Sequence, residues 1–411
     1  MAPIVAISFK IAYTFASWAN NKFGAPHSKI PYIGIMSYNF DQIIDRTTSH
    51  SSKWSKFDPD VLPFWVADMD FAAPEFILEA IRERLQHPIL GYTTKPDSLT
   101  QAFLGWLEYH YQWSVPEEWV VWVPGVVPML NLATRTLAPS SSLLIPTPVY
   151  HPFLSLAANA GITDIRVPMS IDDKSGLWCM DFDALAAALT PSTRMLMICN
   201  PQNPTGRCYS IDELRQLAEF IEQHDLLLVS DEIHCNIILD PTCQHHPIAA
   251  RFPEIAQRTI NLYAATKVYN IPGISCAAAI IPDAKLRKKF IGAKAGLLPG
   301  IGPLGFVASE VAFNDRSDWV PQLLAYLRKN LNEISNVVGE RLTPLQATYL
   351  AWINVTDLGL DNTESYFAKA GLGISPGAQF GEPNYIRFNF GCPQQTLNEG
   401  LQRLDQAIQT T

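Results

Sequence analysis

The chain has 411 residues, of which 48% are hydrophobic and 17% are charged, and its formal net charge at pH 7 is −9. This length allows a large hydrophobic core and two or three domains. The acidic balance leaves no basic footprint for nucleic acid, and no polybasic run favours an anionic membrane. No stretch reaches the roughly 18 apolar residues of a membrane span, so we expect neither nucleic acid nor a membrane as a partner.

Residues 1–35 are mildly apolar, but Lys10 interrupts them and no basic region precedes them, which makes a poor signal peptide. Met36 begins the stretch "MSYNFDQIIDRTTSHSSKW", a plausible start for a folded enzyme. We therefore expect residues 1–35 to be an extension outside the catalytic fold, and translation from Met36 is an alternative.

Two helices are predicted before the first strand. Leu78, Ile81 and Leu85 recur at helical spacing after Pro74, and proline suits the first turn of a helix. A second helix is expected over residues 98–112.

Short apolar segments then alternate with helices. The segments predict strands that are buried on both faces of a sheet, at 119–124, 142–146, 194–200, 226–232, 259–267 and 273–281. A helix is expected over about 127–137, and Ser210 and Glu213 form a capping box for another. This alternation predicts a mainly parallel α/β sheet, whose ligands lie beyond the carboxyl ends of the strands.

The pattern changes after Pro303. Long helical stretches run to about residue 341, and short strands at 351–355 and 385–390 flank a helix near 361–370. This part of the chain predicts a separate, smaller α+β domain.

Cysteine spacing favours reduced thiols in a cytoplasmic protein, because the count is odd and no pair is spaced as CxxC. A metal or redox site is the weak alternative, and we expect no metal. The seven cysteines are Cys179, Cys199, Cys208, Cys235, Cys243, Cys276 and Cys392.

Three polar residues follow predicted strands and could open into one crevice: Asn203, Asp231 and Lys267. An amide, a carboxylate and an amine suit pyridoxal 5′-phosphate (PLP). Its aldehyde needs a lysine for a Schiff base, and its ring nitrogen needs a carboxylate to stay protonated. Its phenolic oxygen needs donors, which Asn203 and His234 can supply, and its phosphate needs the N–H groups of a helix start.

The motifs "NPTG", "SDEIH", "ATK" and "IRFNFGCP" resemble, in this order, the fold-type I PLP enzymes of the aspartate aminotransferase superfamily. The stretches "SSKW", "PFWVADMDF", "GYTTKPD", "TPVYHPF", "SDEIHCN" and "KVYNIPG" resemble its cystathionine β-lyase branch, the MalY/PatB-type C–S lyases. The match covers about residues 37–408. It implies an α/β fold with a mainly parallel seven-stranded sheet in a large PLP-binding domain at 81–317. An arm at 36–80 would contribute to a small α+β domain at 318–411.

The resemblance implies that Lys267 is the Schiff-base lysine and the acid/base that moves the Cα proton. Its amine must then be neutral, so its pKa should be lowered by burial and by the nearby pyridinium. A surface lysine is the alternative. Asp231 would pair with the ring nitrogen. Alternatively it caps a helix, and Glu232 would be an ordinary solvated charge.

Three more side chains would contact the cofactor. Asn203 would hydrogen-bond the phenolic oxygen, although Asn-Pro-Thr-Gly also makes a turn by itself. His234 could face the same oxygen, and a core histidine is its rival. Tyr150 would stack on the pyridine ring, with a core aromatic as the alternative.

The phosphate would bind to the backbone amides of Gly125, Val126 and Val127 at a helix start. Tyr92 would reach the phosphate of a neighbouring subunit, which implies a homodimer with shared active sites. A tyrosine in a surface loop is the alternative for Tyr92.

The substrate would be a small amino acid. Arg387, inside the apolar strand "YIRFNF", would bind its carboxylate through a bidentate pair, and a structural salt bridge is the alternative. Ala67 matches the position whose backbone N–H contacts the same carboxylate. Ser275 replaces an arginine that many aminotransferases use for the phosphate, and Ala264 replaces a common serine. Both departures argue against strict transaminase behaviour, and neither argues against PLP.

Three functions follow. The first is a PLP-dependent lyase that cleaves cystathionine, cystine or another cysteine S-conjugate by α,β-elimination to a thiol, pyruvate and ammonia. The second is an aminotransferase of the same fold, which shares every site residue. The third is a non-enzymatic regulator, against which the intact set of Lys267, Asp231 and Arg387 argues.

Overall fold

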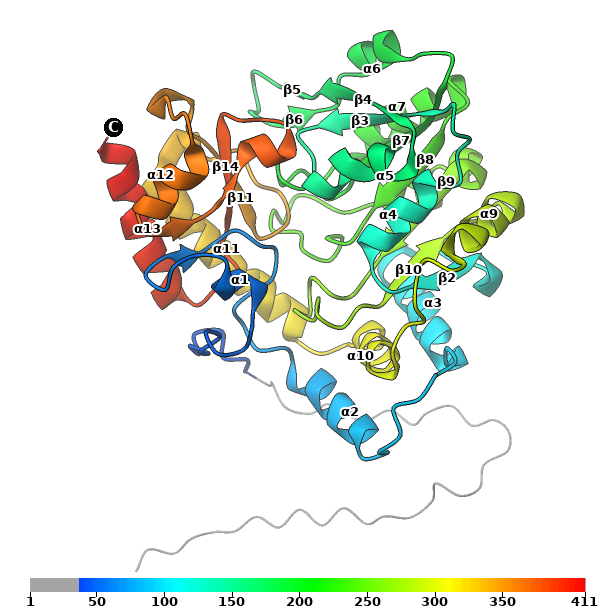
Figure 1. Ribbon diagram of the computed structural model, residues 1–411, viewed down its shortest axis with the longest axis horizontal. Helices are drawn as coiled ribbons and strands as arrows, with labels where there is room; N and C mark the ends of the chain where they lie inside the picture. The colour runs from blue at the N-terminus through cyan, green and yellow to red at the C-terminus, as the bar shows by residue number, and fades with distance from the viewer. Residues whose placement is uncertain (1–36, 411) are drawn as a thin grey trace, which may run out of the picture. The chain divides into compact units, whose positions relative to one another are not determined.

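A seven-stranded sheet, which we call the central sheet, organises most of the described chain (Figure 1). The structure is a computed structural model that describes residues 37–410. The strand order of the central sheet is β2-β10-β9-β8-β7-β3-β4, and only β10 runs antiparallel to its neighbours. The strands are β2 (Val120–Val123), β3 (Ser142–Thr147), β4 (Thr163–Pro168), β7 (Thr193–Cys199), β8 (Leu227–Asp231), β9 (Thr259–Tyr263) and β10 (Ala277–Ile280). The predicted seven-stranded, mainly parallel α/β sheet is confirmed.

Helices cover both faces of the central sheet, which is why its strands are apolar on both sides. Leu143 and Ile145 of β3 point to one face, and Leu144 between them points to the other. The first face packs on α4 (Val126–Thr134), α5 (Leu156–Ala160) and α9 (Ala284–Lys294). The second packs on α3 (Asp97–Tyr111), α6 (Phe182–Ala188), α7 (Ile211–Gln223) and α10 (Pro303–Phe313).

A smaller antiparallel sheet, which we call the C-terminal sheet, has the order β11-β14-β13 and is drawn in orange and red in Figure 1. Its strands are β11 (Leu350–Asn354), β13 (Ser375–Pro376) and β14 (Tyr385–Asn389). The helices around it are α11 (Trp319–Val338), α12 (Thr363–Lys369) and α13 (Gln394–Gln409). The strands and helix predicted after residue 350 are confirmed. The sequence reading did not identify α13.

The N-terminal part of the described chain joins these C-terminal elements, because β1 (Leu62–Pro63) pairs in parallel with β12 (Leu372–Gly373). The remaining α-helices are α1 (Ser52–Ser55), α2 (Glu75–Leu85) and α8 (Ile248–Arg251), and the remaining strands form the hairpin of β5 (Ser170–Ile171) with β6 (Trp178–Cys179). The described residues from 37 to 410 form one unit by their contacts, so the domain boundaries expected from the sequence stay predictions. The predictions for residues 1–35 and Met36 lie outside the described residues.

The predicted helices are present with small changes at their ends. Pro74 directly precedes α2, and α4 begins one residue before the predicted start and ends at Thr134. At α7 the hydroxyl of Ser210 accepts from the Glu213 N–H, and the Glu213 carboxylate accepts from the Ser210 N–H, so the capping box is confirmed. Among the described residues, no helix is both long and apolar enough to cross a membrane.

Candidate active site

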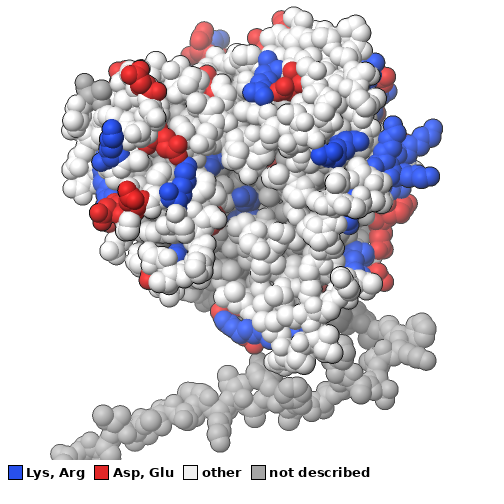
Figure 2. Space-filling model, in the orientation of Figure 1, with Lys and Arg blue, Asp and Glu red and all other residues white. Residues whose placement is uncertain are grey.

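A cavity of about 390 Å³ lies where β7, β8 and β9 end. Because carboxyl ends of parallel strands meet at one edge of a sheet, residues far apart in sequence converge there. Figure 2 shows this face hollowed, with Lys or Arg atoms visible in the hollow. The predicted site residues that line the cavity are Ala67, Gly125, Val126, Val127, Tyr150, Asn203, Asp231, His234 and Lys267.

Lys267 brings an amine into this cavity four residues after β9 ends. Its Nζ donates to the carbonyl oxygen of Ala67 over 2.6 Å. Burial lowers the pKa of the amine to about 8, and the positive charge of Arg387 acts in the same direction, while Asp68 and Asp231 oppose it. The amine is therefore readily deprotonated in mildly alkaline solution, as a general base requires.

Asp231 is the last residue of β8 and is 2% exposed. Its carboxylate accepts from the backbone N–H of Ile233 over 3.2 Å and forms no ion pair with any basic side chain in the described part of the chain. Burial raises the pKa of this carboxyl to about 7, and the positive charge of Lys267 partly offsets that rise. The helix-cap alternative is wrong, because the residues after Asp231 form turns and the next helix is α8.

Arg387 lies on β14, and its guanidinium contacts the cavity wall. Its Nη1 donates to Oδ1 of Asn203 over 3.0 Å, and its Nη2 donates to the carbonyl of Trp65 over 2.6 Å and to the Ser375 hydroxyl over 3.4 Å. Burial lowers its pKa to about 10, so it stays protonated at neutral pH. The salt-bridge alternative is wrong, since no acidic side chain from residue 37 to 410 pairs with it. This buried cation, whose Nε lacks a partner, suits a carboxylate ligand.

His234 adds a buried ring to the wall of the cavity, and Tyr150 adds a partly buried one. His234 is 2% exposed, and its Nδ1 has no hydrogen-bond partner within residues 37–410. Burial, with the positive charge of Lys267, lowers the pKa of His234 well below its ordinary value, so the ring is neutral. Burial raises the pKa of the Tyr150 hydroxyl. The neutral imidazole therefore has a ring nitrogen available to a ligand oxygen.

An anion site is available at the start of α4. Gly125 precedes this nine-residue helix with φ +110°, a conformation that glycine adopts without strain. No side chain caps the helix, so its first N–H groups, including those of Val126 and Val127, are free to bind a ligand in the cavity. The positive end of the helix dipole lies at the same place. Ser275 and Ala264, which replace typical aminotransferase residues, also line the cavity.

Ala67 and Tyr92 differ in their positions relative to the cavity. Ala67 lines the cavity, and its carbonyl accepts from Lys267 and from the Tyr349 hydroxyl. Tyr92 lies between α2 and α3, is fully exposed at 113%, and does not line this cavity. Its role in a neighbouring subunit stays a prediction.

The expectation that Glu232 is a solvated charge is wrong. Its side chain is 0% exposed, accepts from Tyr263 and Asn261, and lies 2.9 Å from Nε2 of His245. Because successive strand residues alternate between faces, Glu232 points away from the cavity that Asp231 faces. It is held there by residues whose proximity the sequence does not reveal.

Sequence reasoning also missed residues in and behind the wall. Cys199 lines the cavity and pairs in register with Asp231, whereas the cysteine spacing predicts only a reduced thiol. The position of Cys199 at a strand end was the available signal. Tyr349 had no comparable signal, because its contact with Ala67 joins positions 282 residues apart.

The donor set of the cavity fits PLP. A buried carboxylate without a cation suits a protonated ring nitrogen, and a buried amine suits an aldehyde. The unpartnered Nδ1 of His234 suits a phenolic oxygen, and the start of α4 suits a phosphate. PLP combines all four groups in one molecule.

Comparison with known proteins gives a consistent family. The sequence model described as aminotransferase class I and II matches residues 59–404. Cystathionine beta-lyase PatB from Bacillus subtilis (strain 168) is 34% identical over 388 residues, which cover 90% of this chain and 100% of PatB. The crystal structure of OvoB superposes with a TM-score of 0.88 at 36% identity, covering 91% of this chain and 100% of OvoB. Cystalysin from Treponema denticola, whose crystal structure contains a pyridoxal 5′-phosphate cofactor, superposes with a TM-score of 0.85 at 28% identity. The match covers 91% of this chain and 100% of cystalysin.

Proposed function

The chain belongs to the family of class I and II aminotransferases, and we propose that it is a PLP-dependent carbon–sulfur β-lyase. It cleaves cystathionine or another cysteine S-conjugate by α,β-elimination to a thiol and an enamine, and water hydrolyses the enamine to pyruvate and ammonia. The observation that carries the proposal is one cavity holding an amine and a carboxylate, Lys267 and Asp231, with the Arg387 guanidinium bonded to its wall at Asn203. The likeness to PatB along its whole length supports the lyase reaction.

Each polar residue of the cavity has a role toward PLP in this proposal. Lys267 would join it covalently, Asp231 would face its ring nitrogen, and the start of α4 would take its phosphate. Asn203 and His234 would face its phenolic oxygen, and the ring of Tyr150 would stack on its ring. When bound, PLP withdraws electrons from the carbon that bears the substrate amine, which makes the hydrogen on that carbon acidic.

Arg387 would bind the substrate carboxylate. Its guanidinium is buried, stays protonated and has an unpartnered Nε, so a carboxylate can take a bidentate pair there. The backbone N–H of Ala67 would contact the same carboxylate. This binding fixes the direction of the Cα–H bond relative to the Lys267 amine.

Lys267 would move the proton. Once the substrate amine has replaced Nζ at the PLP aldehyde carbon, Lys267 is a free amine again. Its lowered pKa makes the neutral form accessible, so Nζ accepts the proton from the substrate Cα. The bond between Cβ and sulfur then breaks and the thiolate leaves with the electron pair. The ammonium formed at Nζ is a nearby acid that can return the proton to the sulfur.

The aminotransferase reaction would use the same residues but not expel the thiolate. Ser275 and Ala264 in the cavity wall, together with the likeness to PatB, favour elimination. The test is to incubate the protein, PLP and L-cystathionine with and without a keto-acid acceptor. We expect pyruvate and free thiol without an acceptor. Turnover only with an acceptor would indicate an aminotransferase, and no turnover in either condition would indicate a regulator.

A homodimer with shared active sites belongs to the same proposal. Tyr92 is exposed beside the exposed apolar side chains of Ile89 and Leu90. Leu90 also borders a second cavity of about 630 Å³, which shares Pro124 and Ser275 with the first. A second copy covering this surface would bring Tyr92 to its partner's phosphate site. The free state of all seven cysteines supports a reducing, cytoplasmic location.

A further inference from the structure

One segment of backbone contacts both functional cations. Residues 64–71, which we call the strap, run between the loop that follows Lys267 and strand β14. The carbonyl of Trp65 accepts from Arg387, and the carbonyl of Ala67, two residues later, accepts from Lys267. The strap therefore sets where both side chains end.

Two asparagines fix the strap. The Asn389 amide donates to the carbonyls of Val66 and Asp68, which flank Ala67. Asn270 accepts from the N–H of Met69 over 2.9 Å and donates to the carbonyls of Met69 and Phe71 over 2.9 and 2.7 Å. These side-chain bonds hold the backbone on both sides of Ala67, so the Ala67 carbonyl has little freedom to move.

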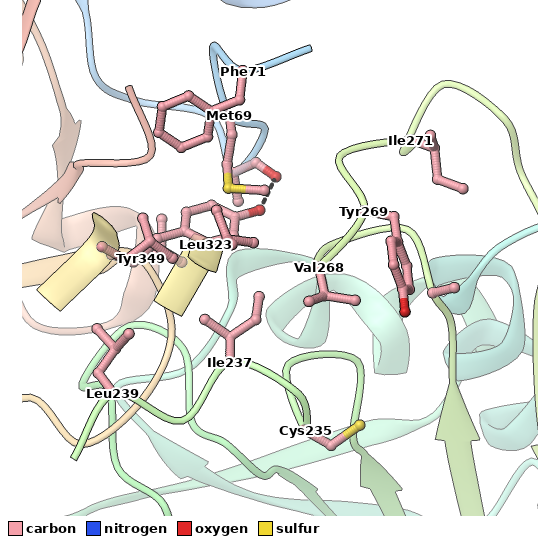
Figure 3. Close-up of a cluster of buried hydrophobic side chains, with 14 of the residues drawn as sticks. Met69, Phe71, Cys235, Ile237, Leu239, Val268, Tyr269, Ile271, Leu323 and Tyr349 are labelled. Carbon is pink, nitrogen blue, oxygen red and sulfur yellow. Dashed lines mark hydrogen bonds between the residues drawn. The ribbon is translucent and has the colours of Figure 1, made fainter. Parts of the chain in front are cut away.

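Tyr349 makes the second hydrogen bond to the Ala67 carbonyl. Its ring is 0% exposed, and its hydroxyl donates to that oxygen over 3.0 Å, while Nζ of Lys267 lies 2.6 Å from the same oxygen. Figure 3 shows Tyr349 beside Met69 of the strap and Leu323 of α11, with the hydrogen bond drawn as a dashed line. One acceptor thus serves two donors from distant parts of the chain.

A shared acceptor changes the balance between the two forms of the amine. A carbonyl that accepts from an ammonium stabilises the charged form. A second donor on the same oxygen takes part of its electron density, and the positive end of the hydroxyl dipole faces the ammonium. Tyr349 therefore favours the neutral amine of Lys267. Asn270, which holds the carbonyl near the amine, favours the charged form.

We propose that Tyr349 is a positioning residue that acts through the Ala67 carbonyl, and that this carbonyl holds the Lys267 amine whenever the amine is not joined to PLP. The proposal rests on the proposed function, because it assigns Lys267 to the cofactor. Neither Tyr349 nor Asn270 lines the cavity, so both act at one remove from the reacting atoms.

The test uses the apoprotein and added pyridoxal 5′-phosphate. The rate at which the visible absorbance band forms is followed against pH, because only the neutral amine attacks the aldehyde. In Tyr349→Phe we expect the apparent pKa to rise. Its rate should be about threefold to tenfold lower on the acid side, as for loss of one hydrogen bond, and should equal the wild-type rate in alkali.

Asn270→Gly should shift the apparent pKa in the opposite direction. Glycine tolerates the φ of 52° at this position, so the substitution removes the amide without backbone strain. We expect the apparent pKa to fall, because the strap loses its bonds to the loop after Lys267, which weakens the contact of the Ala67 carbonyl with the ammonium. Tyr366→Phe is the matched control, since Tyr366 on α12 donates to the carbonyl of Ala407 on α13. Its profile should coincide with that of the wild type.

Each outcome decides the matter. Superimposable profiles for Tyr349→Phe and wild type, or shifts of the same sign in Tyr349→Phe and Asn270→Gly, would overturn the inference. A uniform loss of rate at every pH would assign Tyr349 to folding alone and would also overturn it. Opposite shifts in a protein that forms the band but cleaves no thioether would support the inference and contradict only the lyase function.

Discussion

Nη1 of Arg387 donates to Oδ1 of Asn203 over 3.0 Å, although 184 residues separate them in sequence. The bond joins β14 of the C-terminal sheet to the turn after β7 of the central sheet. A substrate carboxylate on Arg387 and a cofactor oxygen on Asn203 would therefore bind to two groups that already touch. Binding at one position is expected to affect the orientation of the other.

Replacing Arg387 with lysine should impair substrate binding more than cofactor binding. An ammonium cannot form the bidentate pair, and charge-assisted hydrogen bonds are worth about 1.5–3 kcal/mol, so kcat/KM should fall about a hundredfold. The visible band with PLP should remain. Steady-state kinetics and absorbance check this, with the more exposed Arg341→Lys as the control. An unchanged kcat/KM would remove Arg387 from the substrate site.

Lys267→Ala should lose the visible absorbance band of bound PLP and all pyruvate formation. The physical reason is that no other amine lines the cavity among the described residues. Lys285→Ala, at an exposed position of α9, should keep both. Persistence of the band in Lys267→Ala would show that a different lysine is joined to PLP.

Asp231→Asn should flatten the dependence of apoprotein stability on pH. The folded pKa of Asp231 is raised to about 7 from 3.8, so the folded state binds the extra proton between about pH 4 and pH 7. Stability from this group is present at low pH and is lost as the pH rises through 7. The loss is on the order of a few kcal/mol, since each pKa unit is worth about 1.4 kcal/mol. Urea unfolding at pH 5 and pH 8 measures this. An equal change in the free energy of unfolding between the two pH values for wild type and Asp231→Asn would show that Asp231 is solvated.

Glu232→Gln should destabilise the fold by about 3 kcal/mol. The buried carboxylate accepts from Tyr263 and Asn261 and contacts His245. In glutamine, an NH2 group would replace one of the acceptor oxygens and would point at a donor. Glu222→Gln on the exposed side of α7 should change the free energy of unfolding by less than about 0.5 kcal/mol. Equal midpoints in urea for the two variants would contradict the buried network.

Mixing two inactive variants should restore activity if active sites are shared. Subunits carrying Tyr92→Ala and subunits carrying Lys267→Ala would form hybrids in which one site is intact, giving about a quarter of wild-type activity after random exchange. Unfolding and refolding the mixture, followed by the pyruvate assay, measures this. Recovery of no activity above that of the separate variants would contradict the role of Tyr92 in a partner subunit.

The sequence by itself predicted every strand of the central sheet except β4, together with the amine, carboxylate and amide at the edge of the sheet. Strands buried on both faces are continuous apolar runs, and parallel strands end together, so chain order alone predicts that Asn203, Asp231 and Lys267 share one crevice. Chain order was enough because each of these residues is local to its own strand end.

Only the tertiary structure decided what surrounds those residues. Arg387 was recognised in the sequence, but its bond to Asn203 depends on how the C-terminal sheet packs against the central sheet. Glu232 was misjudged because alternation gives the face of a strand, whereas its burial depends on side chains that arrive from other elements. Tyr349 escaped notice for the same reason: its contact with Ala67 crosses 282 residues, and no local pattern encodes such a distance.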